Sequence, residues 1–533
     1  MKLRFFPLAC LATMFMVACS SDLPTNEDNK QTDISETTTD GLTAFNATVE
    51  ETRGVITDTP DNDPATRTAA SYNGKLNFTF YTGDRVWINT PFNSQNWQQD
   101  SRNTIRGKTA SATFYFPGAF DRSKSYKVRY TGTGNASSDK ITIAGTQRQT
   151  SPNDATQVGA SGDCATGVAT FSTRYNRWNF SLDRKASYLT FAPRNAPGFV
   201  SGMKLIKIKV SNSNSAMSGT FNFNDNGIVL SSRPGANAAN KSITLNVSNF
   251  EIPQNTDPSK NAAVMVLAPG NYSNVTIEYT IYDRTTGVQA VITKSLSSLN
   301  LAAGTNHLVT HNMVVQVYGD SYYMWDAKQE YWYGHKSRQP KENDGQNNFY
   351  PKGRTQDPTR WFSIEYFNGG TAKPATASAK DCPNVNMTHW YVESGEQYWD
   401  NTTPWAVMGH LYKGGMWIKT EQFIKSKVTY PSDLNKETYN GYDFTTQAIG
   451  AEHSKSVNSQ GKPSNIGNYF YLPALGYYND KGRLQNVGKE GYYWTSSPTH
   501  NGFHSAYALN FKSDQIRLYG FNRGYGFPLW VKH

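Results

Sequence analysis

The strongest constraint on the fold is a series of short segments in which apolar and polar residues alternate. Two clear cases are residues 76–80 (LNFTF) and 275–282 (VTIEYTIY). Successive side chains of a strand point to opposite faces, so a strand with one buried face has this two-residue period. Similar segments recur from residue 41 to about residue 312, with Gly, Asn and Pro turn signals between them. The pattern predicts a mostly β chain of antiparallel β-sandwiches or barrels.

The chain of 533 residues is too long for one ordinary domain, and a prior of about 150 residues per domain suggests three. We expect one β-sandwich over residues 41–194 and a second over 195–316. A third, aromatic-rich module is expected over 317–533, because nine of the twelve tryptophans lie there. Within that module, residues 421–427 form the one segment with a helical pattern.

The first 19 residues have the pattern of a lipoprotein signal. A basic start at Lys2 and Arg4 precedes an apolar run too short to span a bilayer, and Cys19 follows a small residue. The Cys19 thiol can then carry the lipid that anchors the chain. An ordinary cleaved signal peptide is the alternative. Residues 20–40 are acidic and poor in apolar residues, which predicts a disordered tether outside the cytoplasm.

The net charge of +10 raises the question of nucleic-acid binding. The Lys and Arg residues are scattered, and no basic helix or zinc-finger spacing is present, so a solvated basic surface is preferred. Beyond residue 19 only Cys164 and Cys382 remain. Since they fall in different expected domains, we expect two free or buried thiols, and a bridge between them would join two domains.

The sequence contains no recognisable catalytic motif. Residues 159–162 (GASG) are one residue short of a nucleophile elbow and are expected to form a β-turn. His500 and His504 are four apart, but Asn501-Gly502 between them favours a turn over a metal-binding helix. Residues 225–227 (DNG) favour a tight turn over a calcium loop. We expect no enzyme activity, metal or cofactor.

Three groups of residues occur in an order that is characteristic of one family. They are the lipoprotein signal and tether followed by Gly83-Asp84-Arg85-Val86-Trp87-Ile88; Ile141-Thr142-Ile143 followed by Gln147-Arg148-Gln149; and Leu267-Ala268-Pro269-Gly270-Asn271 with the closing Leu301-Ala302-Ala303-Gly304. In this order the chain resembles the fimbrillin-like surface lipoproteins of Gram-negative anaerobes. The resemblance implies two transthyretin-like antiparallel β-sandwiches over residues 41–316.

The third module carries a different set of motifs. They are Met324-Trp325-Asp326-Ala327, residues 381–386 (DCPNVN), Gly414-Gly415-Met416-Trp417, Tyr471-Leu472-Pro473-Ala474, residues 491–497 (GYYWTSS) and residues 506–511 (AYALNF). These resemble a Gly/Trp-rich domain related to the C-type-lectin-like fold, which implies an α+β module. We expect Tyr493 and Trp494 on one strand to pack against Tyr507, Leu509 and Phe511 on the next.

The fimbrillin resemblance implies assembly by strand exchange. In that family an Arg-specific protease cuts near the first strand, the strand leaves, and an extended segment of another subunit fills the groove. Arg53 and Arg67 are the candidate cut sites, although each is equally well a simple loop arginine. A free donor segment is needed in a stalk subunit, and the third module occupies that end of this chain, which favours a tip or accessory subunit.

The third module is the expected adhesive part, because exposed Trp and Tyr rings stack on sugars and bind proteins. Most of its aromatic residues are expected in the core. The candidate ligand-binding residues are those in polar turns: Trp399, Asp400, Trp405, Tyr477, Tyr478 and Asn479.

Together these observations predict a fimbrial tip or accessory adhesin, lipid-anchored and exposed on the outer membrane. Its expected partners are other fimbrial subunits and a glycan or protein ligand, with no nucleic acid. The alternative is a non-polymeric surface lipoprotein that captures glycans.

Overall fold

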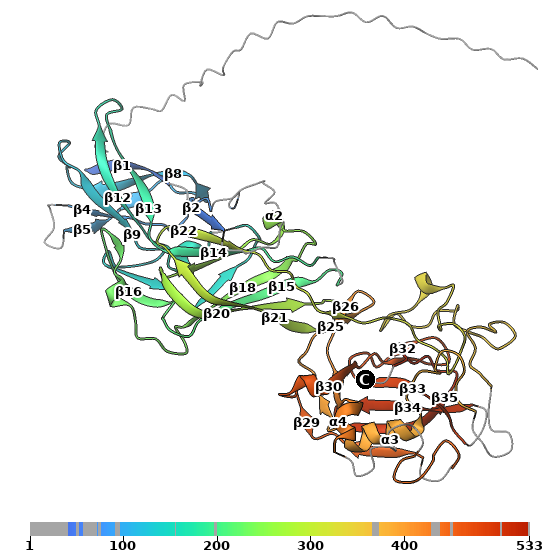
Figure 1. Ribbon diagram of the computed structural model, residues 1–533. Coiled ribbons are helices and arrows are strands. Elements are labelled where there is room, and N and C mark those ends of the chain that lie inside the picture. The colour runs from blue at the N-terminus through green and yellow to red at the C-terminus, as the bar shows by residue number, and fades with distance from the viewer. Residues whose placement is uncertain are drawn as a thin grey trace, which may run out of the picture.

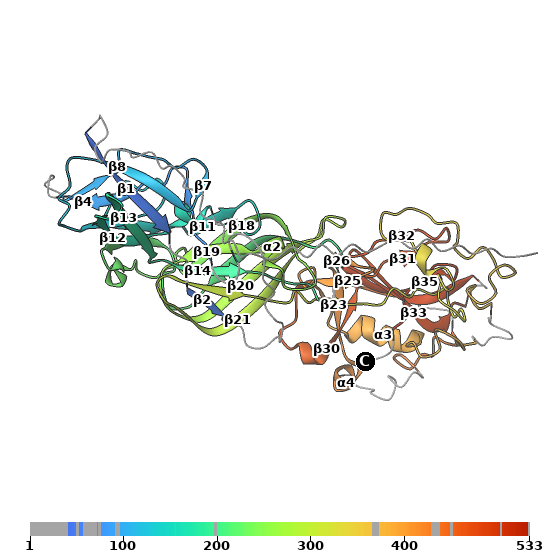
Figure 2. The ribbon, with the colours of Figure 1, turned by 90° about the horizontal axis from the view of Figure 1, so that it is seen from above.

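The computed structural model describes residues 41–49, 53–56, 72, 76–90, 96–154, 156–196, 200–364, 373–427, 438–447, 451–500 and 504–530. Three units lie in a row, with the second in the middle (Figures 1 and 2). The chain is mostly β, which confirms the prediction from the alternating segments.

The first unit, called the first sandwich, is one curled sheet of eight strands in the order β5-β4-β9-β12-β13-β1-β8-β6, with a small β3-β7 pair beside it. Its strands are β1 (Leu42–Val49), β3 (Phe80–Tyr81), β4 (Trp87–Asn89), β5 (Trp97–Gln99), β6 (Arg102–Asn103), β7 (Lys108–Thr109), β8 (Ser111–Pro117), β9 (Tyr126–Tyr130), β12 (Ala165–Ser172) and β13 (Arg177–Arg184).

The two ends of this sheet, β5 and β6, are joined by the short link through Asp100. The Asp100 carboxylate is fully buried and accepts hydrogen bonds from the Val86 amide at 2.8 Å and from Arg85 Nε at 2.9 Å. Asn103 Nδ2 donates to the same carboxylate at 3.1 Å. Asp100 thus ties together the opposite ends of the curled sheet, which brings the buried faces of its strands around one core.

The middle unit, called the second sandwich, contains the sheets β11-β18-β15-β20-β21, β19-β14-β22-β2 and β10-β16-β17. Its elements are β2 (Arg53–Ile56), β10 (Lys140–Ile143), β11 (Thr146–Gln149), α1 (Val158–Ser161), β14 (Ser187–Phe191), β15 (Lys204–Ser211), β16 (Gly219–Asn224), β17 (Gly227–Ile228), β18 (Ser242–Glu251), α2 (Pro258–Asn261), β19 (Ala263–Leu267), β20 (Gly270–Tyr282), β21 (Gln289–Leu301) and β22 (Thr305–Val309).

Strand pairing does not follow the boundary that the sequence suggested at residue 194. Four strands that precede this residue, β2, β10, β11 and β14, pair with strands of the second sandwich. In addition, several pairs are parallel, among them β1 with β13 and β14 with β22. Alternation predicts that a segment is a strand, but it carries no information on which sheet the strand joins.

The Gln147-Arg148-Gln149 motif on β11 has a specific structural role. Gln147 pairs with both backbone groups of Val266 on β19: its Nε2 donates to the carbonyl at 2.7 Å and its Oε1 accepts from the amide at 2.9 Å. Gln149 likewise accepts from the Val264 amide at 2.7 Å and donates to the Ala262 carbonyl at 2.9 Å. These side chains therefore replace a neighbouring strand along the edge of β19, where unpaired backbone groups are otherwise a site for aggregation.

The C-terminal unit packs helices and short sheets around an aromatic core. Its elements are β23 (Gln316–Val317), α3 (Val385–Ser394), β24 (Tyr398–Trp399), β25 (Trp405–Val407), β26 (His410–Tyr412), β27 (Gly415–Lys419), α4 (Glu421–Lys425), β28 (His453–Ser456), β29 (Ser459–Gln460), β30 (Tyr469–Pro473), β31 (Tyr477–Tyr478), β32 (Leu484–Gln485), β33 (Gly491–Pro498), β34 (Ser505–Lys512) and β35 (Gln515–Asn522). Short 3-10 helices occupy Leu230–Ser232, Lys336–Arg338 and Ile466–Asn468.

Three of the local predictions need correction. Of the alternating segment 76–80, only Phe80 lies in a strand, β3, although Leu76, Phe78 and Phe80 are buried in the alternating order that was predicted. Residues 159–162 do not form a β-turn, because Val158–Ser161 is one helical turn that ends at Gly162 with a φ of 108°. The helix predicted at 421–427 is present as α4, but the longer helix α3 was missed. The predicted tight turn at 225–227 is confirmed between β16 and β17.

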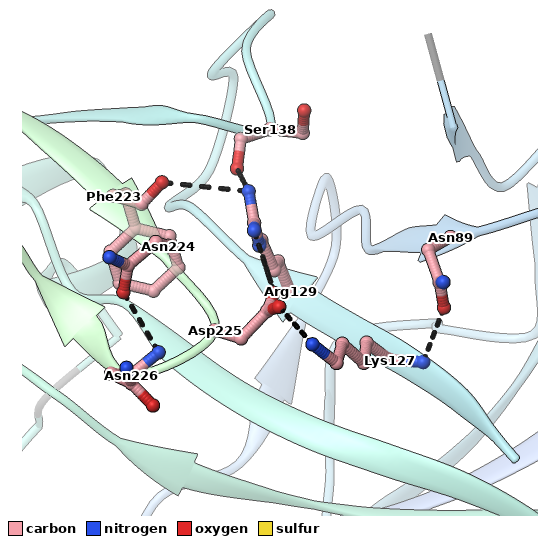
Figure 3. A network of polar contacts seen from close by, with 8 residues as sticks. All are labelled: Asn89, Lys127, Arg129, Ser138, Phe223, Asn224, Asp225 and Asn226. Atoms are coloured by element: carbon pink, nitrogen blue, oxygen red, sulfur yellow. Dashed lines mark hydrogen bonds and ion pairs between the residues drawn. The ribbon is translucent and has the colours of Figure 1, made fainter. Parts of the chain in front are cut away.

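The turn at residues 225–227 of the second sandwich contacts the first sandwich. Asp225 accepts from Lys127 Nζ at 2.5 Å and from Arg129 Nη2 at 2.6 Å, both on β9 of the first sandwich (Figure 3). Arg129 also donates to the Ser138 carbonyl at 3.0 Å and lies over the Trp97 ring at 3.9 Å. Partial burial acts to raise the pKa of Asp225, but the hydrogen bonds from Lys127 and Arg129 outweigh it and lower the pKa.

A second carboxylate, the buried Asp283, joins the second sandwich to the C-terminal unit. Asp283 accepts from the Leu411 amide at 2.9 Å and contacts His410 Nδ1 at 3.2 Å, both on β26. Thr286 Oγ1 donates to the Leu411 carbonyl at 2.9 Å. The side chains of Ala406 and Leu411 complete the core of the second sandwich. The β25–β26 hairpin is therefore part of both units.

We predict that Gln147→Ala lowers the free energy of unfolding by about 1–3 kcal/mol, because it leaves the buried amide and carbonyl of Val266 on β19 unpaired. Gln149→Ala should also lower it, because it leaves the Val264 amide of β19 unpaired, whereas the Ala262 carbonyl keeps its hydrogen bond from the Asn153 amide. Arg148→Ala is the matched control, since Arg148 is exposed between them and should change stability by less than about 0.5 kcal/mol. Urea unfolding followed by circular dichroism measures all three. Equal effects of the three substitutions would show that the glutamines do not pair with β19.

Candidate functional site

The first candidate site is the strand β1, which lies between β8 and β13 (Figure 2). It pairs antiparallel with β8, where Phe45 is opposite Phe114, and parallel with β13, where Phe45 is opposite Trp178. Thr43 Oγ1 donates to the Gly118 carbonyl at 2.7 Å, and Asn46 Oδ1 accepts from Thr113 Oγ1 at 2.8 Å. The strand is thus hydrogen-bonded along both edges.

Phe45 places an aromatic ring from β1 at the centre of the first core. The side chain is fully buried and stacks on Trp178 at 5.1 Å between ring centroids. Its edge contacts are Phe116 at 5.4 Å and Phe120 at 4.9 Å. Loss of β1 would therefore open an apolar groove between β8 and β13 whose backbone groups lack partners, which is a template for an added strand.

Of the candidate cut sites, Arg53 begins β2, where its backbone is paired in parallel with Thr305 of β22. The N-terminal segment consequently gives β1 to the first sandwich and β2 to the second. Cys19, the predicted signal and tether, and Arg67 lie outside the described residues.

In the second candidate site, the predicted ligand-binding rings are buried. Trp399 is 5% exposed, and Trp405 is fully buried with its Nε1 donating to the Gly414 carbonyl at 3.0 Å. Trp405 also stacks on Tyr412 at 5.3 Å. The Gly414 backbone lies against the Trp399 ring, since a Cβ on residue 414 would be 3.1 Å from that ring. The expectation that these rings are exposed is wrong, because they fill the core beneath the turn.

Asp400 has no free capacity for a sugar hydroxyl. The carboxylate is fully buried and accepts from the amides and hydroxyls of Thr402 and Thr403 at 2.6–3.1 Å and from Trp417 Nε1 at 3.0 Å. Burial acts to raise its pKa, but these hydrogen bonds outweigh it and lower the pKa of Asp400 to about 2. Asp400 holds a turn in place and does not face solvent.

The second group of predicted residues, Tyr477 to Asn479, lies on a different hairpin. Tyr478 is fully buried, and its hydroxyl donates to the Pro340 carbonyl. Asn479 Oδ1 accepts from the Lys481 and Arg483 amides, both at 3.0 Å, and so closes the hairpin turn. Tyr477 and Asn479 are partly exposed. The structure therefore leaves Tyr477 as the one predicted ring of this group that is available for contact.

Tyr477 belongs to an aromatic patch whose other residues were not predicted from the sequence. We define this patch as the partly or fully exposed residues Tyr477, Arg517, Tyr519, Phe521 and Tyr525. Tyr519 is 42% exposed, and Arg517 lies over its ring at 5.0 Å. The Tyr477 and Tyr525 ring centroids are 5.5 Å apart. The signal was the two-residue spacing of Arg517, Tyr519 and Phe521 on β35, which puts all three on one face.

The prediction that Tyr493 and Trp494 of β33 both pack against residues of β34 is confirmed only for Tyr493. Tyr493 stacks on Phe511 at 6.0 Å, as expected. Trp494 points the opposite way and stacks on Phe527 at 4.2 Å. Adjacent residues of a strand cannot share a face, so only one of the two could meet the predicted partners.

Both cysteines of the described residues are buried and free, which confirms the expectation of two unbridged thiols. Burial raises the pKa of the Cys164 thiol well above its usual range and that of Cys382 to about 12. Within the described ranges, no group of three or more His, Cys, Asp or Glu residues is placed to hold a metal ion. No helix among those residues is long and apolar enough to cross a membrane.

A buried histidine, His389, lies within the C-terminal unit. His389 on α3 donates from Nε2 to the Ala451 carbonyl at 3.0 Å and stacks between Tyr439 at 4.8 Å and Phe444 at 4.6 Å. The ring of His453 is 5.3 Å away. Burial, aided by the nearby His453, lowers the pKa of His389 to about 4, although the bond to Ala451 acts in the opposite direction.

No protein-family model matches the chain, and no curated protein matches it. Among solved structures it is similar to a fimbrial protein of Bacteroides ovatus, with 10% identity and a TM-score of 0.26 over 91% of this chain and 99% of that one. A candidate cell adhesion protein of Bacteroides uniformis has 14% identity and a TM-score of 0.27 over 51% and 95%. For the shaft pilin of Lactobacillus rhamnosus GG the values are 10% and 0.19 over 51% and 99%. TM-scores this far below 0.5 do not establish a shared fold or function.

We predict that acid destabilises the C-terminal unit through His389. Between its ordinary pKa of 6.5 and its folded pKa of about 4, the unfolded chain binds more protons at this residue than the folded chain does. The contribution of His389 to the free energy of unfolding is therefore complete above pH 6.5. It falls as the pH drops toward 4, by at most about 3 kcal/mol.

His389→Gln keeps a donor for Ala451 and should flatten the pH dependence of the unfolding midpoint in this range. Tryptophan fluorescence follows the transition, because nine of the twelve tryptophans lie beyond residue 318. His335→Gln, outside this cluster, should leave the pH dependence unchanged. An unchanged slope in His389→Gln would contradict the assignment.

Proposed function

We propose that this protein is a cell-surface fimbrial subunit of the tip or accessory kind, and that it is assembled by exchange of its first strand. The observation that carries the proposal is the position of β1 between β8 and β13, with Phe45 in the core. β1 is the first strand of this sheet in the described residues, so a cut beyond it separates it from the chain while β8 and β13 stay connected through the rest of the sequence.

The short pairing of β2 supports the same proposal. Among the described strands, β2 is an edge strand that pairs with β22 through Arg53 to Ile56. A protease cut after Arg53 would remove the covalent connection of β1 to the rest of the chain. A cut after Arg67 would free β1 and β2 together.

The C-terminal unit is proposed as the adhesive part, with the aromatic patch as its contact surface. Exposed Tyr rings offer apolar faces to sugar C–H groups, and the Arg517 guanidinium offers hydrogen bonds. Arg517 Nε donates to Asn510 Oδ1 at 2.7 Å, which fixes the guanidinium beside the rings. Aromatic and Arg side chains together are also typical of protein interfaces.

The remaining parts of the proposal come from the sequence. The lipoprotein signal with Cys19 supports a lipid-anchored location on the outer membrane surface, and the sequence, in which no catalytic motif was recognised, supports the proposal of a protein that is not an enzyme. Turnover of a surface polysaccharide by the purified chain would contradict the second statement.

We predict that an Arg-specific protease cuts the chain once near the first strand and that β1 then exchanges with a synthetic peptide of residues 42–49. Intact mass before and after cutting identifies Arg53 or Arg67, and Arg53→Ala and Arg67→Ala each remove one site. Labelled peptide bound to the cut chain is measured by size-exclusion chromatography.

A peptide with Phe45→Ala should bind at least about tenfold more weakly, because loss of a buried Phe typically costs about 3–5 kcal/mol. The control peptide carries Thr48→Ala, since Thr48 is exposed. If the cut chain unfolds, or keeps its own strand and takes up no peptide, strand exchange is excluded and a non-polymeric glycan-binding lipoprotein becomes the better account.

For the adhesive surface, we predict that Tyr519→Ala lowers binding to host-cell or glycan-array targets at least about fivefold without a change in the melting temperature. Tyr442→Ala is the matched control, because Tyr442 is 57% exposed in the same unit but outside the patch. Equal binding by both variants would exclude the patch as the contact surface.

A further inference from the structure

A cavity of about 230 Å³ lies where the cores of the two sandwiches meet. Tyr130 of the first core and Phe78 and Val158 of the second contribute to its lining. Tyr81, which is 42% exposed, also lines it, so the cavity reaches the surface. Its volume is below the usual range of about 300–1,000 Å³ for drug-sized ligands, which suits one small molecule.

Three charged residues, Asp84, Asp163 and Arg184, line this cavity. Arg184 and Asp163 form a buried ion pair, and the Tyr188 hydroxyl donates to the same carboxylate. Asp84, which is 5% exposed, accepts from the Tyr130 hydroxyl at 2.9 Å. Thr133 Oγ1 donates to it at 2.6 Å. The lining is therefore organised by internal bonds before any ligand enters.

Some polar atoms of the lining lack a partner within the described part of the chain. They are Arg184 Nε, a donor on a side chain that is 5% exposed, and Asn77 Oδ1, an acceptor. A buried donor or acceptor without a partner typically costs about 1–3 kcal/mol, so such groups require a bound molecule or water. The cavity thus presents one unused donor and one unused acceptor.

The charges of the lining argue against an ionic ligand. Arg184 is paired with Asp163, and Lys108 is paired with Asp154 at 2.9 Å, so an anion would have to compete with an existing carboxylate for either base. A simple ammonium ion offers no acceptor for Arg184 Nε. A hydroxyl group can both accept from Arg184 Nε and donate to Asn77 Oδ1 or Asp84.

The rings of the cavity favour a molecule with apolar C–H groups as well. Phe78 lies at 4.3 Å from the Arg184 guanidinium carbon and at 5.0 Å from the Tyr188 ring, which fixes its orientation. Tyr81, the exposed ring of the lining, supplies a second aromatic side chain. Aromatic faces of this kind bind the C–H faces of sugars.

We propose that this cavity binds a small, neutral, hydroxyl-rich molecule, such as a single sugar unit or a polyol. Hydroxyl groups of the molecule bond to Arg184 Nε and Asn77 Oδ1, and its C–H groups contact Phe78 and Tyr81. The site depends on neither strand exchange nor the aromatic patch, so it goes beyond the function proposed above.

The test is isothermal titration calorimetry of the uncut full chain with glucose, galactose, mannose, sorbitol and glycerol. Gluconate and glucosamine are the anionic and cationic counterparts. We expect at least one neutral compound to bind with a dissociation constant below about 1 mM, which corresponds to roughly 4 kcal/mol. Absence of binding by every neutral compound at this level, or stronger binding of gluconate or glucosamine, would overturn the proposal.

Variants locate the binding. Asn77→Ala and Tyr81→Ala should each weaken binding at least about fivefold. The melting temperature should stay unchanged, because Asn77 Oδ1 has no partner in the described part of the chain and the Tyr81 side chain is exposed. Arg184→Lys keeps the positive charge beside Asp163 but removes Nε and should also weaken binding. Tyr175→Ala, 57% exposed and outside the lining, is the control. Unchanged binding in both Asn77→Ala and Tyr81→Ala would place the ligand elsewhere and contradict the assignment.

Discussion

The packing of Phe45 between two halves of one sheet is the contact on which the first sandwich depends. β1 brings this ring against Trp178 of β13 and Phe116 of β8, strands that are far apart in the sequence. Without β1 these strands have no common neighbour in the sheet order. Because one short segment completes both the hydrogen-bond ladder and the core, the same segment is a suitable element for exchange between subunits.

The units that follow are held together by charged and polar groups placed at their junctions. Asp225 binds the first sandwich through Lys127 and Arg129 (Figure 3), and Asp283 binds the C-terminal hairpin through the Leu411 amide. Both contacts are reinforced by packing: Arg129 over Trp97, and Leu411 in the second core. In Figure 1 the units lie in a row, with the C-terminal unit at the end opposite to the first sandwich.

Alternation located the strand at residues 275–282, which lies within β20. Alternation could not assign strands to sheets. For this reason β14 was expected in the first sandwich, whereas it pairs with β19 and β22 of the second. The motif around Gln147 was recognised, but its pairing with Val266 depends on a contact between residues that are distant in sequence. Such pairings follow from tertiary structure and leave no local pattern.

The C-terminal unit was less predictable, for two physical reasons. Helix α3 (VNMTHWYVES) is buried on nearly every side and rich in β-branched and aromatic residues, so it lacks the polar stripe by which a surface helix is recognised. Its clearest local signal is Asn384, whose side chain caps the Met387 amide at 2.9 Å. The loop tryptophans were misplaced because a polar turn such as that of Asp400 can cover a buried ring. Composition alone cannot separate this case from exposure.

Hydrogen exchange on the cut protein tests the central claim most directly, namely that β1 is a separable strand that completes the first sandwich. After cleavage and removal of β1, amides of β8 and β13 that pair with it should lose protection, while those in β15 and β20 of the second sandwich should keep theirs. Adding back the peptide of residues 42–49 should restore protection in β8 and β13. Simultaneous loss of protection throughout both sandwiches would contradict the account, because it would make β1 an inseparable part of one folding unit.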